Sequence, residues 1–141
     1  MDLRVIIDNE FDQLTNLVFK MYKDINADIT PFGAANTLMH DILTREGFLA
    51  IGLFNDDNTL VGFSTGYSET NKFEKKLFYF SGIYVIMRNN RNLKKLIDFS
   101  FAKIKELGYT NWLVDATNPN ILSILKKYSG EELYTRLEGK L

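Results

Sequence analysis

The 141-residue sequence predicts a single α/β domain with a mixed sheet, and three observations support this class. Short β-branched and aromatic runs alternate with segments whose apolar residues recur every three or four positions. Hydrophobic residues make up 45% of the chain, which is enough for one core and too little for two ordinary domains. No repeat, low-complexity tract or Pro/Gly-rich linker divides the sequence, so residues 1–141 are expected to form one domain.

The first third of the chain predicts one strand followed by two helices. Residues 3–7 are an apolar run with β-branched members, which is typical of a strand. Asp8 or Asn9 can cap a helix over about 11–25, where apolar side chains repeat at helical spacing. A second helix is expected over about 34–45. Its predicted core-facing residues are Leu38, Ile42 and Leu43.

The middle of the chain predicts a hairpin and a central strand. Residues 48–54 and 60–69 are two strand-like runs. The connection at 55–59, Asn-Asp-Asp-Asn-Thr, consists of residues that tolerate left-handed backbone and favour turns. Residues 77–87 are long, aromatic and β-branched, which predicts a central strand buried on both faces.

The last third predicts helix, strand, helix and strand. The most regular helical period runs from near Asn92 to the stop signal at Gly108. Its expected inward positions are Leu93, Leu96, Ile97, Ser100, Phe101, Ile104 and Leu107. A strand at 110–117 follows, then a short helix that opens at Asn118 and ends by Gly130, and residues 132–141 close the chain as a strand.

The stretch VIMRNNRNLKKLIDF, at 85–99, reads as a strand, a polar loop and a helix. Together with the chain's size and element order, it resembles the GNAT superfamily, the acetyl-coenzyme-A-dependent N-acyltransferases. The resemblance covers nearly the whole chain and implies a mixed, mostly antiparallel central sheet with helices on both faces. In that family this loop carries Q/R-x-x-G-x-G/A, and its amides hold the coenzyme A pyrophosphate at the helix N-terminus. If that site is retained, the cofactor-binding residues are Arg88, Asn89, Asn90, Arg91, Asn92, Leu93 and Asn118.

The loop departs from the family motif at its two small positions. Arg88 matches the first motif position, but Arg91 stands at the first glycine and Leu93 at the Gly/Ala position. Both side chains add bulk where a cofactor would lie against the backbone.

The segment NPNILSILKKYSG resembles the family pattern N-x-x-A-I-x-F-Y-E-K-x-G-F. Asn118 matches the asparagine, while the tyrosine that serves the family as general acid falls on Leu125. Leucine has no proton to donate, and Tyr128 lies three positions later. We therefore predict no catalytic residue here.

A general base is also difficult to identify. The family often places a carboxylate on or beside the fourth strand, but residues 77–87 contain none. Glu69 and Glu74 flank the preceding connection, and His40 lies in the second predicted helix. We expect these three side chains to be solvated rather than catalytic.

Four basic residues, Arg88, Arg91, Lys94 and Lys95, lie close together around the start of the predicted helix. They have two interpretations. One is a phosphate site in which side chains replace glycine amides. The other is a solvated helix start, which makes the cluster a candidate for binding an acidic partner surface.

The composition excludes several functional classes. A net charge of -1 argues against general nucleic-acid binding, which requires a basic excess. The sequence has no cysteine and one histidine, so it offers no thiol nucleophile, zinc ribbon or multi-histidine metal site. No window approaches the ~18 apolar residues of a membrane span, and the N-terminus lacks a secretory pattern. A cytoplasmic location without membrane attachment is expected.

Three functions remain compatible with these residues. The preferred prediction is a catalytically degenerate GNAT-like protein without a cofactor, acting through protein partners or a homo-oligomeric assembly. Tailed bacteriophages use such folds as degenerate virion or assembly proteins, and a short, cysteine-free, Lys/Asn-rich chain is compatible with that origin. The alternatives are an active N-acetyltransferase with an atypical acetyl-coenzyme A loop, and a non-catalytic sensor of an acyl-coenzyme A or another phosphate ligand.

Overall fold

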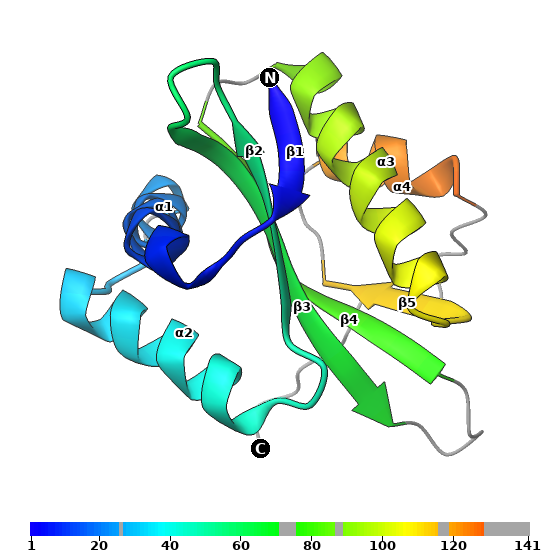
Figure 1. The fold of residues 1–141 in the computed structure, drawn as a ribbon, viewed down its shortest axis with the longest axis horizontal. Helices are drawn as coiled ribbons and strands as arrows, with labels where there is room; N and C mark the ends of the chain where they lie inside the picture. The colour runs from blue at the N-terminus through cyan, green and yellow to red at the C-terminus, as the bar shows by residue number, and fades with distance from the viewer. Residues whose placement is uncertain (26, 71–75, 87–88, 116–118, 129–141) are drawn as a thin grey trace.

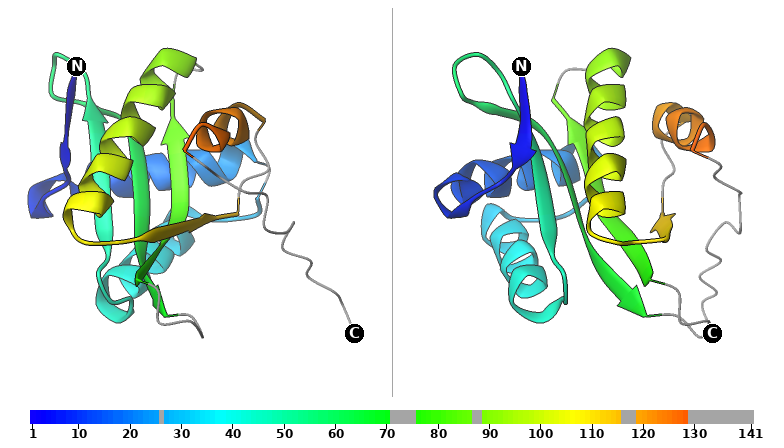
Figure 2. Two further views of the ribbon diagram at one scale, coloured as in Figure 1. Left: turned by 90° about the vertical axis from the view of Figure 1, so that its right-hand side faces the viewer. Right: turned by 45° about the vertical axis from the view of Figure 1, so that its right-hand side comes forward.

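A five-stranded sheet forms the centre of the molecule, with helices on both of its faces (Figures 1 and 2). The computed structural model describes residues 1–25, 27–70, 76–86, 89–115 and 119–128. The strands are β1 (Asp2–Val5), β2 (Leu49–Phe54), β3 (Leu60–Thr70), β4 (Lys76–Val85) and β5 (Asn111–Val114). The helices are the 3-10 turn η1 (Asp8–Glu10), α1 (Phe11–Asp24), α2 (Pro31–Thr44), α3 (Asn90–Glu106) and α4 (Pro119–Lys126).

The sheet is mixed and mostly antiparallel, as expected. The five described strands follow one another in chain order, and among them only β4 and β5 pair in parallel. Helices α1 and α2 cover one face, while α3 and α4 cover the other (Figure 1). The predicted fold class is therefore confirmed.

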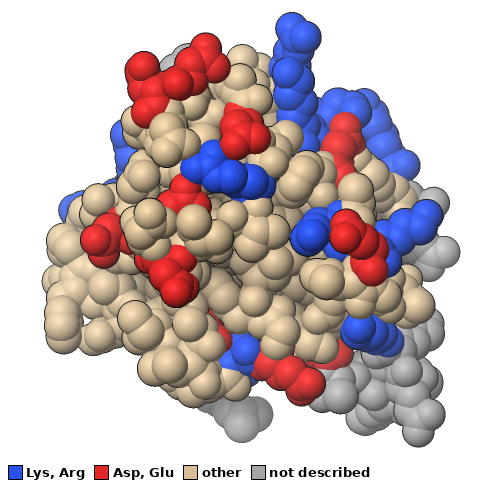
Figure 3. Space-filling model, in the orientation of Figure 1, with Lys and Arg blue, Asp and Glu red and all other residues tan. Residues whose placement is uncertain are grey.

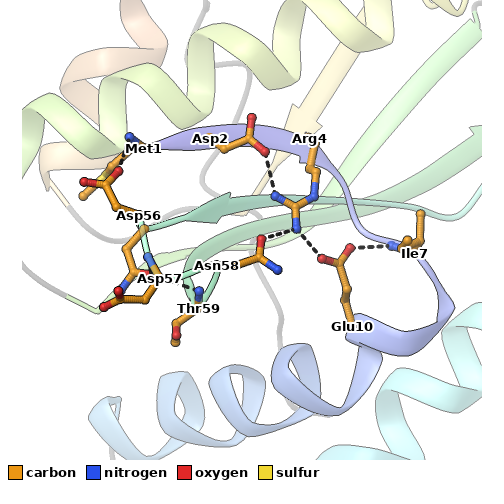
Figure 4. A network of polar contacts seen from close by, with 10 residues as sticks. Met1, Asp2, Arg4, Ile7, Glu10, Asp56, Asp57, Asn58 and Thr59 are labelled. Atoms are coloured by element: carbon orange, nitrogen blue, oxygen red, sulfur yellow. Dashed lines mark hydrogen bonds and ion pairs between the residues drawn. The ribbon is translucent and has the colours of Figure 1, made fainter.

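A polar junction holds the N-terminal strand to the β2–β3 turn (Figure 4). The Arg4 guanidinium donates to Asp2 (2.6 Å), Glu10 (2.5 Å) and Asn58 (2.8 Å). It also lies 3.6 Å from the centre of the Phe54 ring. One arginine therefore connects β1, η1 and the hairpin turn.

The predicted cap of the first helix is wrong. Asp8 and Asn9 belong to η1, and no side chain caps α1, which begins at Phe11. The buried carboxylate of Glu10 instead accepts the Ile7 amide (3.1 Å). Because the Glu10 carboxylate accepts the Ile7 amide, the chain can enter α1 through the 3-10 turn η1, which is tighter than an α-helical turn.

Helix α2 begins earlier than the sequence predicted. It starts at Pro31, and the Thr30 hydroxyl accepts the Gly33 amide at 3.0 Å. Threonine at the cap followed by proline at the first helical position is a standard start signal, and the predicted start at about residue 34 missed it.

The predicted inward face of α2 is only partly correct. Ala34 and Leu38 are buried and Ile42 is half-buried, but Leu43 is 75% exposed. The helix turns its Ala34–Leu38 side toward α1 and the sheet, which leaves Leu43 on the outer side.

The predicted hairpin is confirmed. Asn55 begins the turn and its side chain accepts the amides of Asp57 (3.0 Å) and Thr59 (2.9 Å). Asn58 has φ 60°, a left-handed conformation that asparagine tolerates well.

The central strand prediction is confirmed for β4, although its burial is uneven. Phe78 and Phe80 are buried, whereas Ser81 is exposed and the residues up to Ile86 are half-buried. The expectation of burial on both faces is therefore wrong for the second half of β4. Met87 lies outside the described residues.

Helix α3 begins at Asn90, two residues earlier than expected, and Gly108 supplies the left-handed stop with φ 90°. Ser100 is buried, donates to the Leu96 carbonyl (2.7 Å) and meets the Ser64 hydroxyl (2.7 Å), which links α3 to β3. Leu107 is 45% exposed because it lies beyond the last helical turn, so its predicted inward position is wrong.

The C-terminal elements agree in part with expectation. Trp112 lies in β5 and meets the Phe101 ring edge-on at 5.1 Å. Helix α4 ends at Lys126 rather than close to Gly130. The predictions for Asn118, Gly130 and the strand at 132–141 fall outside the described residues.

Candidate functional site

The parallel pairing of β4 with β5 covers only the first half of β4. Leu77–Phe80 pairs with Asn111–Val114, and the rest of β4 has no β5 partner within the described residues. The β3–β4 register shifts between Thr65/Gly66, which leaves Ser81 as an extra residue and bends β4. Since α3 and α4 follow these strands, the point where they part corresponds to the usual ligand position of open α/β sheets.

Aliphatic side chains fill the space beside this divergence. Four buried residues form the α3–α4 cluster: Leu93, Ile97, Ile124 and Leu125. Ile83 and Val85 of β4 pack against this cluster, as does Val114 of β5. The α3–α4 cluster therefore joins both helices to both strands where a ligand would have to enter.

Two members of the α3–α4 cluster stand at positions where this sequence departs from the GNAT motifs. Leu93, at a small-residue position of the family motif, is 9% exposed, and Leu125, at the tyrosine position, is 2% exposed. The nearby Tyr128 stacks its ring on Phe101 at 4.3 Å between centroids. Tyr128 thus belongs to an aromatic contact, and nothing in the described geometry gives it the role of a general acid.

Three amides in the first turn of α3 already have partners. The Asn89 side-chain oxygen accepts the amides of Arg91 (3.0 Å) and Asn92 (3.4 Å), while its carbonyl accepts the amide of Leu93 (3.0 Å). Asn90 is exposed and Asn92 is buried. An anion at this helix end would have to displace the Asn89 cap.

The basic cluster is largely on the surface. Arg91, Lys94 and Lys95 are exposed near the start of α3, and Arg88 lies outside the described residues. Lys94 forms an ion pair with Asp98 one turn later (2.7 Å). Figure 3 shows basic side chains over the upper right of the molecule, where α3 lies. The structure brings three of the four predicted residues together, one of them already paired.

The opposite face of β4 carries polar groups that the sequence prediction missed. The Tyr84 hydroxyl donates to Asp24 of α1 at 2.5 Å, and the Thr65 and Ser81 hydroxyls are 3.0 Å apart. Burial and the Asp24 hydrogen bond raise the pKa of Tyr84 above its ordinary value. Tyr84 and Asp24 are 60 positions apart, so no local sequence pattern could have paired them.

A small cavity of about 30 Å³ lies on this face, between α1, α2 and the sheet. Tyr22 and Asp41 line it together with Thr65 and Ser81. Burial, together with the negative charge of Asp41, raises the pKa of Tyr22. The cavity is about large enough for one water molecule or a comparably small polar group.

A further carboxylate stands directly after β5. Tyr79 projects from the face of β4 opposite Phe78 and Phe80, and its hydroxyl donates to Asp115 (2.9 Å). The sequence prediction did not consider Asp115, because its search for a base covered only β4 and the connection before it. Its position just after an apolar strand was the available signal.

The other base candidates lie away from the divergence. His40 is exposed on α2, on the far side of the sheet from α3. Glu69 is half-buried near the end of β3, and Glu74 lies outside the described residues.

A larger cavity, about 640 Å³, lies at the other end of α3. Phe101, Tyr109, Trp112 and Tyr128 give it an aromatic lining. It is separate from the α3 N-terminus and includes none of the predicted cofactor-binding residues.

Within the described part of the chain no group of three or more acidic, histidine or cysteine side chains could hold a metal. None of the described helices combines the length and apolarity needed to cross a membrane.

Solved structures of several acetyltransferases share this arrangement. A probable acetyltransferase matches with a TM-score of 0.82 and 16% identity, covering 100% of this chain and 97% of the other. A ribosomal-protein-alanine N-acetyltransferase from Brucella melitensis biovar Abortus 2308 matches with 0.75 and 16%, covering all of both chains. An aminoglycoside acetyltransferase from an uncultured soil metagenomic sample matches with 0.70 and 21%, covering 99% and 95%.

No family model and no curated protein sequence matches the chain. The structural similarity, at 16–21% identity, shows the fold alone. The chain has the acetyltransferase fold that its resemblance to the GNAT superfamily implied.

Proposed function

We propose that this chain is a GNAT-family protein that no longer transfers acetyl groups and acts as a binding component of a protein assembly, such as a phage virion. The observation that carries the proposal is that Leu93 and Leu125 both belong to the buried α3–α4 cluster. These two leucines stand where the family places a small residue and its proton donor. Their place in one cluster gives both residues the same structural role.

Coenzyme A fits these residues poorly. A pyrophosphate at a helix N-terminus needs unpaired amides, and the Asn89 cap already holds those of Arg91 and Asn92. Close approach of the cofactor to the backbone needs small residues, and Leu93 is instead buried against α4. We therefore assign no chemical step to acetyl-coenzyme A in this chain.

Calorimetry with acetyl-coenzyme A tests the proposal directly. We expect weak binding or none, whereas a dissociation constant in the low micromolar range or below would overturn the proposal. The Arg91→Gly/Leu93→Gly variant is measured beside the wild type, because it has small residues at both motif positions and should bind acetyl-coenzyme A more tightly if those side chains obstruct it. Each glycine costs up to about 1 kcal/mol of helix propensity, and loss of the buried Leu93 side chain costs about 2–5 kcal/mol more. Thermal melts must therefore show that the variant is folded.

The basic cluster is the first candidate for the binding surface. Arg91 and Lys95 are exposed, and with Lys94 they form a local positive patch on a chain of net charge -1. Such a patch orients encounters with acidic surfaces in a salt-dependent way.

Charge removal tests this patch with poly-glutamate as an acidic probe. Changing Arg88, Arg91, Lys94 and Lys95 to serine should leave folding intact and weaken binding and its salt dependence. The control changes four lysines elsewhere, Lys20, Lys23, Lys105 and Lys127, to serine with the same loss of charge. Equal weakening by both variants would mean that net charge, rather than the patch, determines binding.

One observation favours a second candidate function, an active N-acetyltransferase with an atypical cofactor loop. Asp115 presents a carboxylate, oriented by Tyr79, just after β5. Acetylation of an amine needs a base to remove the ammonium proton, and a carboxylate in this position offers one. Thiol release from acetyl-coenzyme A with a panel of primary amines tests this alternative. Release that disappears in Asp115→Asn would favour it over the binding role.

A further inference from the structure

The outer side of α2 carries a row of large apolar side chains. Phe32 is 75% exposed, Met39 53% and Leu43 75%. With the exposed Asn36 they follow the spacing four, three, four, which places all four on one side of the helix. We call these four residues the α2 row. An exposed apolar row of this length is unusual on an isolated surface helix and is typical of an interaction site.

The outer side of α2 carries no Asp, Glu, Lys or Arg side chain. Asp41 is the helix's one charged residue, and it is half-buried on the side that faces the small cavity. The exposed side of α3 carries Arg91, Lys94 and Lys95 instead. Figure 3 shows this contrast, with uncoloured surface along α2 at the lower left.

We propose that the α2 row is the surface through which a second copy of this chain docks, with α2 packed against α2 around a two-fold axis. In such an interface the side chains next to the axis meet their own copies, so a charge there would approach a like charge. A charge-free row avoids this repulsion, whereas a charged partner would find no complementary group on it. The heptad-like spacing lets two identical helices interlock their side chains.

The expected dimer is weak and reversible. Fourteen helical residues extend about 21 Å, which supports an interface at the small end of the specific range. The inference extends the proposed binding role by naming a partner, but it needs neither the presence nor the absence of coenzyme A. Calorimetry with the cofactor and measurement of self-association can therefore fail independently.

Sedimentation velocity over a concentration series provides the first test. The wild type should show a monomer–dimer equilibrium with a dissociation constant of about 1–100 μM, in the range of weak specific interfaces. Met39→Glu and Leu43→Glu should each weaken it at least about tenfold, because each places a charge in an apolar contact. Leu107→Glu is the matched control, since Leu107 is an exposed leucine on another helix end. The Leu107→Glu variant should dimerise with the same dissociation constant as the wild type.

Cysteine cross-linking provides the second test, because the chain has no cysteine of its own. The Asn36→Cys/Met39→Cys variant puts thiols at the centre of the α2 row. It should form disulfide-linked dimers under mild oxidation whether the two helices run parallel or antiparallel. Ala102→Cys/Lys105→Cys, with the same spacing on the exposed side of α3, is the control and should remain monomeric.

A wild type that stays monomeric up to about 1 mM would overturn the proposal, as would a dimer that survives both glutamate substitutions. Equal cross-linking of the two cysteine variants would also overturn it, because collision rather than docking would then explain the product.

Discussion

The two sides of β4 beyond Phe80 differ in chemistry. Toward α3 and α4, Ile83 and Val85 pack on the buried α3–α4 cluster. Toward α1 and α2, the same strand presents the Ser81 hydroxyl and the Tyr84 phenol, with Asp24 bound to the latter. On the side where the sequence placed a cofactor, the described contacts of this part of β4 are aliphatic. The groups able to exchange protons have gathered on the other side.

The largest effect is expected from opening the closed side with Leu125→Ala. Leu125 is 2% exposed, and truncating a buried leucine removes its transfer free energy and leaves a cavity. The free energy of unfolding should fall by about 2–5 kcal/mol, measured by urea denaturation. Leu122→Ala is the control on the same helix. Because Leu122 is only half-buried, its truncation should lower the free energy of unfolding less. Equal losses would show that the α3–α4 cluster is not the tighter packed site.

Removing the α3 cap should have a smaller effect. Asn89→Ala deletes the oxygen that accepts the Arg91 and Asn92 amides, which should cost about 1 kcal/mol. Asn90→Ala, one residue later and exposed, is the control and should change stability little. Asn89→Ala also tests whether the cap keeps anions from binding at the start of α3. If coenzyme A affinity appears in Asn89→Ala alone, the cap and not Leu93 closes the site.

The contribution of Tyr84, on the polar side of β4, to folding stability should depend on pH in alkaline solution. Burial and Asp24 raise the pKa of Tyr84 in the folded protein, so the folded state favours the protonated phenol. This contribution is complete below the ordinary tyrosine pKa of about 10 and is lost as the pH rises toward the folded value. Tyr84→Phe should therefore lose stability less steeply than the wild type above about pH 10, measured by denaturation at several pH values. Parallel loss in both proteins would contradict this assignment.

The smallest effect is expected at the basic cluster. Lys94 and Asp98 form an ion pair between half-exposed side chains, which contributes about 0.3–0.5 kcal/mol at low salt. Lys94→Gln should reduce stability by no more than this amount, and 1 M NaCl should abolish the difference. A larger loss that persists in salt would assign Lys94 a packing role.

Much of the fold was predictable because its signals are local. The helical period of α3, the Asn/Asp-rich turn and the glycine stop at Gly108 each act within a few residues, and all three were confirmed. The start of α2 was equally local, but the prediction from about residue 34 missed Thr30 as the cap and Pro31 as the first helical residue.

The site was less predictable because its decisive contacts are distant in sequence. The leucine at position 93 was visible in the sequence. The cluster that it shares with Leu125 joins residues 32 positions apart and depends on how α3 meets α4. The Asn89 cap was hidden for another reason. Asparagine suits a phosphate loop and a helix cap equally well, and only the hydrogen-bond geometry distinguishes the two.

The Arg4 junction has a consequence for the order in which the protein folds. Arg4 and Asn58 are 54 positions apart, and β1 pairs with β2 only across the whole α1–α2 segment. Contacts between distant residues carry a large loop-closure cost, so this corner should form after the β2–β3 hairpin. Arg4→Met should then accelerate unfolding far more than it slows refolding, which stopped-flow kinetics can measure. During synthesis the first strand would wait unpaired until the hairpin has left the ribosome, with the acids around Arg4 helping to keep it in solution.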